Sequence, residues 1–250
     1  MTYQVFLVAN FFICILLMKW INISQSSAQF KRLTTTFLVG TPLLSLRSYL
    51  KHESSPISKR LLLFRLILSV LFLYLMVKMG HILSGPLEWF ELIIISPIIY
   101  FLTESLGLFG QLLFSPFTPT PSIHRHPLLS RSLGDFWGRR WNSWVQDWLR
   151  DISHQHRNFL KRKIFISFLF SGMFHEAMVN IPYFLFYNES YFGNMTLYFM
   201  IQGLGLWLEK KFLTSVSVQF KRVYLWIFIL GPSPLFLGKP LLSFFGLHYE

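Results

Sequence analysis

The sequence predicts an all-α fold, a polytopic transmembrane helix bundle of about six spans with an amphipathic helix in the cytoplasmic interface. Hydrophobic residues make up 53% of the 250 residues and charged residues only 14%, whereas a soluble domain usually carries about 25% charge. The apolar residues form runs long enough to cross a bilayer, and basic residues gather in alternate connections. We expect a single membrane-embedded domain over residues 1–250, because such a bundle leaves little room for a second, soluble unit.

The expected spans are apolar runs that are closed by basic clusters. They cover Tyr3–Met18, Leu61–Val77, Phe90–Phe114, Ile164–Tyr187, Met195–Leu208 and Val223–Phe245. The first run is near the short limit for a span, but it lacks the basic leading segment of a cleaved signal sequence. The last run is interrupted by Gly231-Pro232-Ser233-Pro234 and by Pro240. We therefore expect it to be either a kinked span or a re-entrant segment.

The positions of Lys and Arg predict a topology. Of the 23 basic residues, 20 fall in the connections 19–60, 115–163 and 209–222, and none falls in the connections 80–89 and 188–194. Because positive residues stay on the cytoplasmic side, we expect three cytoplasmic connections and both chain ends on the opposite side. The net charge of +12 then reflects topology and attraction to anionic membrane lipids, and no nucleic-acid partner is needed to explain it.

The long connection before the fourth span contains an amphipathic segment, which Ser132 is placed to cap. Its apolar residues recur at helical spacing, opposite polar residues such as Asp135, Arg139 and Gln146. The apolar positions are Leu133, Phe136, Trp137, Trp141, Trp144, Val145 and Trp148. An aromatic and basic helix of this type lies in the membrane interface.

His175 and Glu176 lie side by side inside the 24-residue apolar run Ile164–Tyr187. A charge at the centre of a transmembrane helix costs about 2.5–3.5 kcal/mol on insertion scales. Such residues are kept mainly where they face a cavity, a partner or a chemical task, although a buried and inert structural pair is the alternative. Imidazole titrates near neutral pH, so a neutral His175 can accept the proton of an alcohol.

Two sequence motifs together resemble the wax synthase-like branch of the membrane-bound O-acyltransferase superfamily. The first is Ser132-Leu133-Gly134-Asp135-Phe136-Trp137-Gly138-Arg139-Arg140-Trp141-Asn142, and the second is Ser171-Gly172-Met173-Phe174-His175-Glu176. The family signature has the same two segments in this order, about thirty residues apart. The resemblance is close over residues 130–182 and only architectural elsewhere.

The resemblance implies that His175 is the catalytic base and that Asn142 is its active-site partner. It also implies an acyl-CoA donor, a lipophilic alcohol as acceptor and an ester product, with acyl-CoA as co-substrate and no other cofactor or metal. In a eukaryotic cell it implies a multi-pass protein of the endoplasmic reticulum membrane.

The chemistry of neighbouring residues suggests further roles. The Asn142 amide is suited to donate to the thioester carbonyl or to hold part of the CoA. Arg139 and Arg140 are candidates for binding the CoA phosphates, with Trp141 beside them, although basic residues here also serve as topology signals and headgroup contacts. Ser171 lies one turn before His175 and is a candidate for substrate contact. Glu176 points about 100° away from His175, so either a structural or an orienting role is expected for it.

Two other classes of protein stay open at this stage. A membrane metallohydrolase would bind zinc through His175, Glu176 and the paired histidines of the long connection, such as His154 and His156. A transporter or carrier would use His175 and Glu176 to line a path. The single cysteine, Cys14, excludes an internal disulfide.

Overall fold

The computed structural model describes residues 2–24, 37, 41, 43–45, 58–82, 89–114, 120–155 and 163–247. Every secondary-structure element in these residues is helical. Four helices among them are long and apolar enough to cross a membrane: Tyr3–Ser24, Lys59–Ile82, Leu92–Phe114 and Ile164–Tyr187. They coincide with the first four expected spans, so the prediction of an all-α membrane protein is confirmed.

The first half of the bundle consists of α1 (Tyr3–Ser24), α4 (Lys59–Ile82), α5 (Trp89–Ile95) and α6 (Pro97–Phe114). The third expected span is thus interrupted at Ser96, since Pro97 has no N–H group with which to continue α5. Helix α4 packs along α6.

Two polar contacts join α4 to α6 where their otherwise apolar surfaces meet. The Arg65 guanidinium donates to a carboxylate oxygen of Glu104 at 2.7 Å, and Ser105 donates to the hydroxyl of Ser69 at 3.0 Å. Pairing of this kind keeps the charged groups of two spans satisfied away from water. The other residues of α4 between Leu61 and Val77 are apolar around its whole circumference. Only Leu62, Ser69 and Gly80 of this helix are buried, as expected for a helix that faces lipid.

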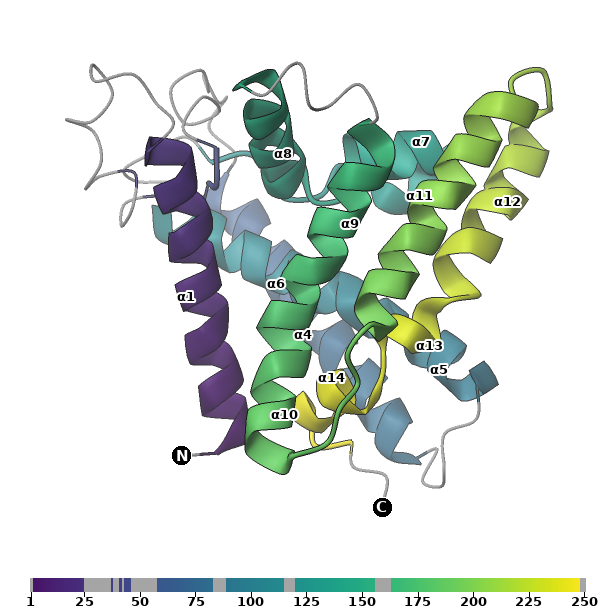
Figure 1. Cartoon of the computed structure of the whole chain (residues 1–250). Helices are drawn as coiled ribbons and strands as arrows, with labels where there is room; N and C mark the ends of the chain where they lie inside the picture. The colour runs from purple at the N-terminus through teal and green to yellow at the C-terminus, as the bar shows by residue number, and fades with distance from the viewer. Residues whose placement is uncertain are drawn as a thin grey trace.

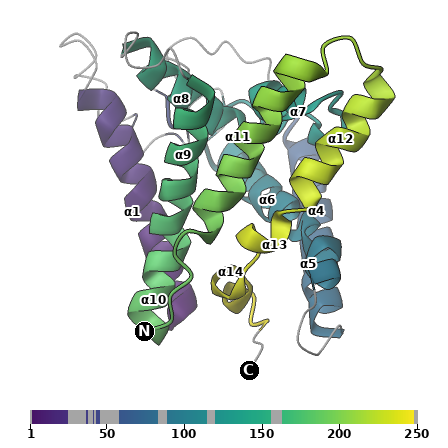
Figure 2. The same ribbon diagram turned by 45° about the vertical axis from the view of Figure 1, so that its right-hand side comes forward.

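The second half centres on two adjacent helical segments (Figures 1 and 2). One is α9 (Lys163–His175), which continues through the π-helical turn η5 (Glu176–Asn180) into α10 (Ile181–Tyr187). The other is α11 (Asn194–Phe212), which packs along α9. A Cβ atom added at Gly172 would lie 2.6 Å from the Thr196 Cα atom, so the close approach of the two backbones requires glycine there.

The expected sixth span is broken into α12 (Val218–Leu230), α13 (Ser233–Phe236) and α14 (Lys239–Phe244). The interruptions fall at Gly231-Pro232 and before Pro240, where the sequence predicted them. A single straight helix over 223–245 is therefore excluded. The short C-terminal helices return into the bundle, and Leu237 and Leu242 pack with Ile95 and Ile98 of α5 and α6.

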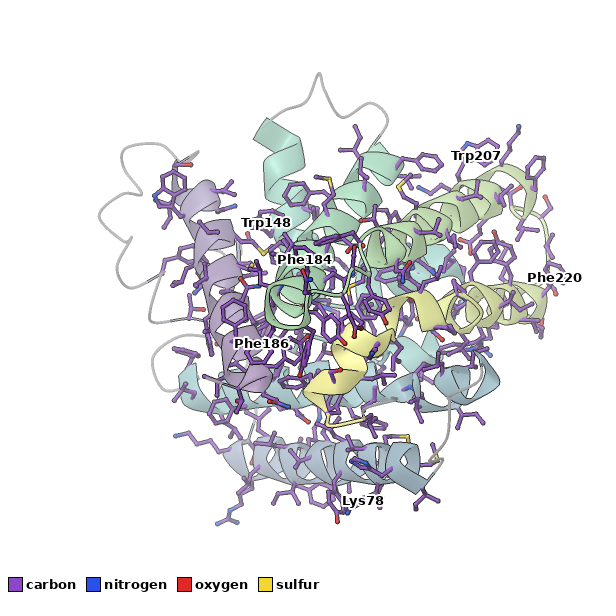
Figure 3. All side chains as sticks on the ribbon, turned by 60° about the horizontal axis from the view of Figure 1, so that its bottom comes forward. Lys78, Trp148, Phe184, Phe186, Trp207 and Phe220 are labelled. Carbon is purple, nitrogen blue, oxygen red and sulfur yellow. The ribbon has the colours of Figure 1, made fainter. Side chains whose placement is uncertain are left out.

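The two ends of the bundle differ in charge. Helix α1 begins and α14 ends at the same end as the connection 188–193, whereas α7, α8 and the connection 213–217 lie at the opposite end (Figure 1). The basic residues of 125–150 and 210–222 therefore gather at one end, as the charge distribution predicted. Outward-facing residues are mostly apolar between the ends. Trp207 and Phe220, for example, lie at the periphery of α11 and α12 (Figure 3).

The interfacial segment is not the single amphipathic helix that its periodicity predicted. It is divided into α7 (Leu133–Asp135), the π-helical turn η3 (Phe136–Arg140) and α8 (Ser143–Gln155). The division occurs because Asn142 adopts a left-handed backbone conformation with φ 45°, which an α-helix does not accept and which Asn tolerates better than most residues. The predicted cap is confirmed, since Ser132 Oγ accepts from the Asp135 N–H at 3.1 Å.

Candidate functional site

His175 is the last residue of α9 and lies among aromatic rings from three elements. Its ring is 4.7 Å from that of Phe199 in α11, measured between centroids, and 5.2 Å from that of Phe236 in α13. Phe174 precedes it in the chain and packs against a cluster that includes Trp144 of α8. The imidazole is therefore half-buried in an apolar environment, as its place in the sequence predicted.

The hydrogen bonding of His175 fixes its tautomer. Nδ1 lies 2.7 Å from the carbonyl oxygen of Ser171, and a carbonyl can only accept, so Nδ1 carries the proton. Nε2 then holds a lone pair, and it has no hydrogen-bond partner among the described residues. The ring thus presents a free acceptor nitrogen. Ser171 contributes its backbone carbonyl to this arrangement.

The backbone just after His175 is held by a helix that is far away in the sequence. The π-helical turn η5 and Pro182, which has no N–H group, leave backbone carbonyls without their usual helical donors. The Asn10 side-chain amide of α1 donates to the carbonyls of Ala177 at 2.9 Å and Met178 at 3.1 Å. The sequence offered one signal for this contact, a lone Asn inside the first apolar run, which sequence reasoning did not use.

The Glu176 carboxylate turns away from His175 and binds the start of α11. Its Oε1 accepts from the backbone N–H groups of Gly193 and Thr196, both at 3.0 Å. Its Oε2 accepts from the side-chain amide of Asn180. These bonds satisfy donors that a helix start leaves without partners, and the negative charge suits the positive end of the helix dipole.

Asn142 lies at the junction between η3 and α8. Its Oδ1 accepts from the Val145 N–H at 3.2 Å and so caps α8. Its Nδ2 has no hydrogen-bond partner among the described residues, which leaves a donor free to bind a ligand. Its backbone N–H donates to Nδ1 of His124 at 3.1 Å.

Two backbone hydrogen bonds hold Asn142 between neighbouring segments. The Arg125 N–H donates to the Arg140 carbonyl at 2.9 Å, and the Ser143 N–H donates to the Ile123 carbonyl at 2.7 Å. The segment 123–125 therefore runs beside 140–143 and fixes the left-handed turn. From the sequence, the paired histidines of the long connection, of which His124 is one, were considered only as zinc ligands, so this contact was missed.

The two motifs meet through aromatic rings. Trp137 of η3 contacts Phe168 of α9 at 5.5 Å and Phe199 of α11 at 5.9 Å between ring centroids, and Phe199 is the ring that packs on His175. Trp137 also donates to the Gln202 side chain at 3.2 Å. Within the described residues no hydrogen bond joins Asn142 to His175. The two side chains can therefore act together only through a bound molecule or through this aromatic cluster.

Arg139, Arg140 and Trp141 have three different environments. Arg139 is exposed. Arg140 donates through Nε to an Asp135 carboxylate oxygen at 2.8 Å and through Nη1 to two backbone carbonyls. Partial burial opposes ionisation of Asp135, but the Arg131 N–H and Arg140 hold the pKa of its carboxyl below the ordinary value. The Trp141 ring stacks on Phe136 at 5.2 Å.

A second buried carboxylate holds the first motif in place. Glu209, near the end of α11, accepts from the N–H groups of Leu133 at 2.6 Å and Gly134 at 3.0 Å. The two motifs are thus anchored to opposite ends of α11, through Glu209 for the first and Glu176 for the second. Sequence reasoning did not single out Glu209.

In the part of the chain that the structure describes, no three His, Cys, Asp or Glu residues are grouped so that they could hold a metal ion. His156 and the side chain of His154, which the metallohydrolase alternative would use, lie outside the described residues.

Comparisons with known proteins match the segment that contains both motifs. Residues 120–201 match the model of the membrane bound O-acyl transferase family. A relative in Arabidopsis thaliana, named probable long-chain-alcohol O-fatty-acyltransferase 9, is 32% identical over 149 residues. That alignment covers 55% of this chain but only 36% of the relative, and no solved structure matches. The resemblance that the sequence predicted is therefore confirmed for this segment: residues 120–201 are similar to the membrane-bound O-acyltransferase family, and the similarity to the named relative agrees with its wax synthase-like branch. The chain spans about a third of the length of that relative.

Proposed function

We propose that this protein transfers an acyl group from acyl-CoA to the hydroxyl of a lipophilic alcohol and so forms an ester. The observation that carries the proposal is the free Nε2 of His175, which lies in an apolar site within the segment that matches the family. The name of the Arabidopsis thaliana relative, which refers to a long-chain alcohol, supports an alcohol of this kind as the acceptor.

In the proposed reaction His175 acts as a general base. The alcohol oxygen attacks the thioester carbonyl carbon while Nε2 accepts the hydroxyl proton. The C–S bond then breaks, and the CoA thiolate takes the proton from Nε2, giving the ester and free CoA thiol. The bond from Nδ1–H to the Ser171 carbonyl supports this role, because it keeps the ring oriented and stabilises the imidazolium while it carries the second proton.

We propose that Asn142 donates from Nδ2 to the thioester oxygen as negative charge develops there. Its Oδ1 is already used in capping α8, which orients the amide with the donor outward. Donors that are fixed in this way before reaction are the most effective at stabilising an oxyanion. Exposed Arg139 is proposed to contact the CoA phosphates, whereas Arg140, Trp141 and Glu176 are proposed to hold the site in shape.

The proposed location is a multi-pass position in a membrane, the endoplasmic reticulum membrane in a eukaryotic cell. The four apolar helices support the first statement. The gathering of basic residues at the end that carries Asn142 and Arg139 supports access of acyl-CoA from the cytoplasmic side.

The test is ester formation by membranes that contain the protein, supplied with labelled acyl-CoA and with a long-chain alcohol, a sterol or diacylglycerol. We expect His175→Ala to lower turnover by about 10²–10⁴-fold, the usual contribution of general-base catalysis, while acyl-CoA still binds. His81→Ala is the matched control, since this exposed histidine lies in the last turn of α4, outside the two motifs. Near-normal turnover in His175→Ala would exclude His175 as the base, and no ester from the wild-type chain with any acceptor would contradict the proposed function.

A further inference from the structure

We infer that His124 is a positioning residue for Asn142, which it holds in the conformation that presents the free amide donor. This inference rests on the proposed function, because it concerns the same site. His124 lies in the segment that precedes the first motif and is only 3% exposed. Its ring packs on that of Trp141, with 4.4 Å between the centroids.

The hydrogen bonds around His124 form a chain with a single direction. Its Nδ1 faces the Asn142 backbone N–H at 3.1 Å, so Nδ1 is an acceptor and Nε2 must carry the proton. Nε2 then donates to the Thr103 hydroxyl at 2.9 Å, and that hydroxyl donates in turn to the Ile99 carbonyl at 2.8 Å. Each group in this series of hydrogen bonds can be only the donor or only the acceptor of a given bond. Helix α6 therefore sets the position of Asn142 through His124.

Asn142 needs such support because its backbone is in the left-handed region, at φ 45°. This region is sparsely populated by residues other than glycine, and strained conformations persist when the surrounding structure determines them. The hydrogen bond that the Asn142 N–H donates to His124 acts on the residue itself, whereas the bonds of Arg125 and Ser143 act on either side of it. Burial lowers the pKa of His124 to about 3, so the ring stays neutral and keeps both bonds at physiological pH.

Two substitutions separate the two bonds of His124. In His124→Asn the side-chain oxygen reaches the position of Nδ1 and can still accept from the Asn142 N–H. In His124→Gln the amide reaches the position of Nε2, which keeps the Thr103 contact and loses the one to Asn142. We expect turnover close to wild type for His124→Asn and a loss of about 10²-fold for His124→Gln, the size typical of a small misplacement in an active site. The Michaelis constant for acyl-CoA should change little in either variant. His126→Asn is the control, since this exposed neighbour also has a positive φ.

A double substitution distinguishes positioning from a purely structural role. If His124 acts through Asn142, His124→Gln should cause no further loss of turnover in an Asn142→Ala background. An equal loss in both backgrounds, or a loss in folded His124→Asn as large as in His124→Gln, would overturn the inference. If both His124 variants fail to fold, Thr103→Val is tested in the same two backgrounds. A loss of turnover that occurs only when Asn142 is present supports the inference. No loss of turnover, or an equal loss in the Asn142→Ala background, overturns it. A wild-type chain that forms no ester contradicts the proposed function instead.

Discussion

Arg139 and Arg140 are neighbours in the chain, but their guanidinium groups have different surroundings. Arg140 is bound to Asp135 and to the carbonyls of Arg125 and His126, so it ties the π-helical turn to the preceding segment. Arg139 lies in the same turn, η3, and is exposed. A planar guanidinium in this setting is well suited to bind phosphate.

The two arginines should therefore give different kinetics when replaced by Gln. We expect Arg139→Gln to raise the Michaelis constant for acyl-CoA with little effect on maximal rate, because only ground-state binding is lost. Arg140→Gln should lower thermal stability and maximal rate, because the bond to Asp135 is lost beside Asn142. The measurement is a titration of acyl-CoA at matched protein amounts for both variants. An unchanged acyl-CoA dependence in Arg139→Gln would make that residue a topology signal or a headgroup contact.

Helix α11 organises the site through its two ends. Glu176, from the motif in α9 and η5, caps its start, and Glu209 near its end binds the N–H groups that begin α7. Glu176 takes the place of a local side-chain cap at Gly193, and Glu209 adds to the local cap that Ser132 gives α7. Helix termination and packing of the two motifs are therefore coupled. The π-helical turn η3 begins directly after α7, which Glu209 holds, and η5 begins at Glu176 itself. Such turns are frequent at functional sites.

The capping role of Glu176 predicts a specific pattern of substitutions. Glu176→Ala should lower the free energy of unfolding by about 1–3 kcal/mol, because the partly buried N–H groups of Gly193 and Thr196 and the buried Asn180 amide lose this acceptor. Glu176→Gln should keep most stability and activity, since the side-chain oxygen still accepts. The control is Glu189→Ala, which removes an ion pair with Lys239 that is largely exposed and is therefore expected to contribute little to stability. Thermal inactivation in detergent compares the stability of the three variants. A Glu176→Gln variant that is stable but inactive would indicate that Glu176 has a role in the chemistry.

The whole bundle is polarised by charge. The start of α1, the end of α14 and the connection 188–193 lie at one end, and the basic connections that the structure describes lie at the other, with the segment that carries Asn142 (Figure 1). This arrangement would present the polar part of acyl-CoA to the basic end and its acyl chain to the apolar interior around His175.

The orientation can be tested with single cysteines in a Cys14→Ser background. We expect a cysteine at Ser190 to react with a membrane-impermeant thiol reagent from the non-cytoplasmic side, and one at Ser215 to react only after the membrane is opened, because basic residues stay cytoplasmic. Both positions are exposed in the structure. The opposite labelling pattern would invert the predicted topology.

The sequence by itself determined the class of fold, the first four apolar helices, the interruption of the last one and the Ser132 cap. These features follow from local composition, since the free energy of inserting a segment into a membrane depends on that segment's own residues. It also determined the two motifs and the family resemblance that they carry. The roles of the predicted site residues stay predictions.

Only the tertiary structure decided how these parts meet. The break at Asn142 is set by the segment 123–125, and the turn after His175 is completed by Asn10 of α1. The apolar periodicity through Trp141 continues across the break, so a local pattern predicted one helix where there are two. The physical reason is that hydrogen bonds between distant segments satisfy backbone groups which helical periodicity cannot report.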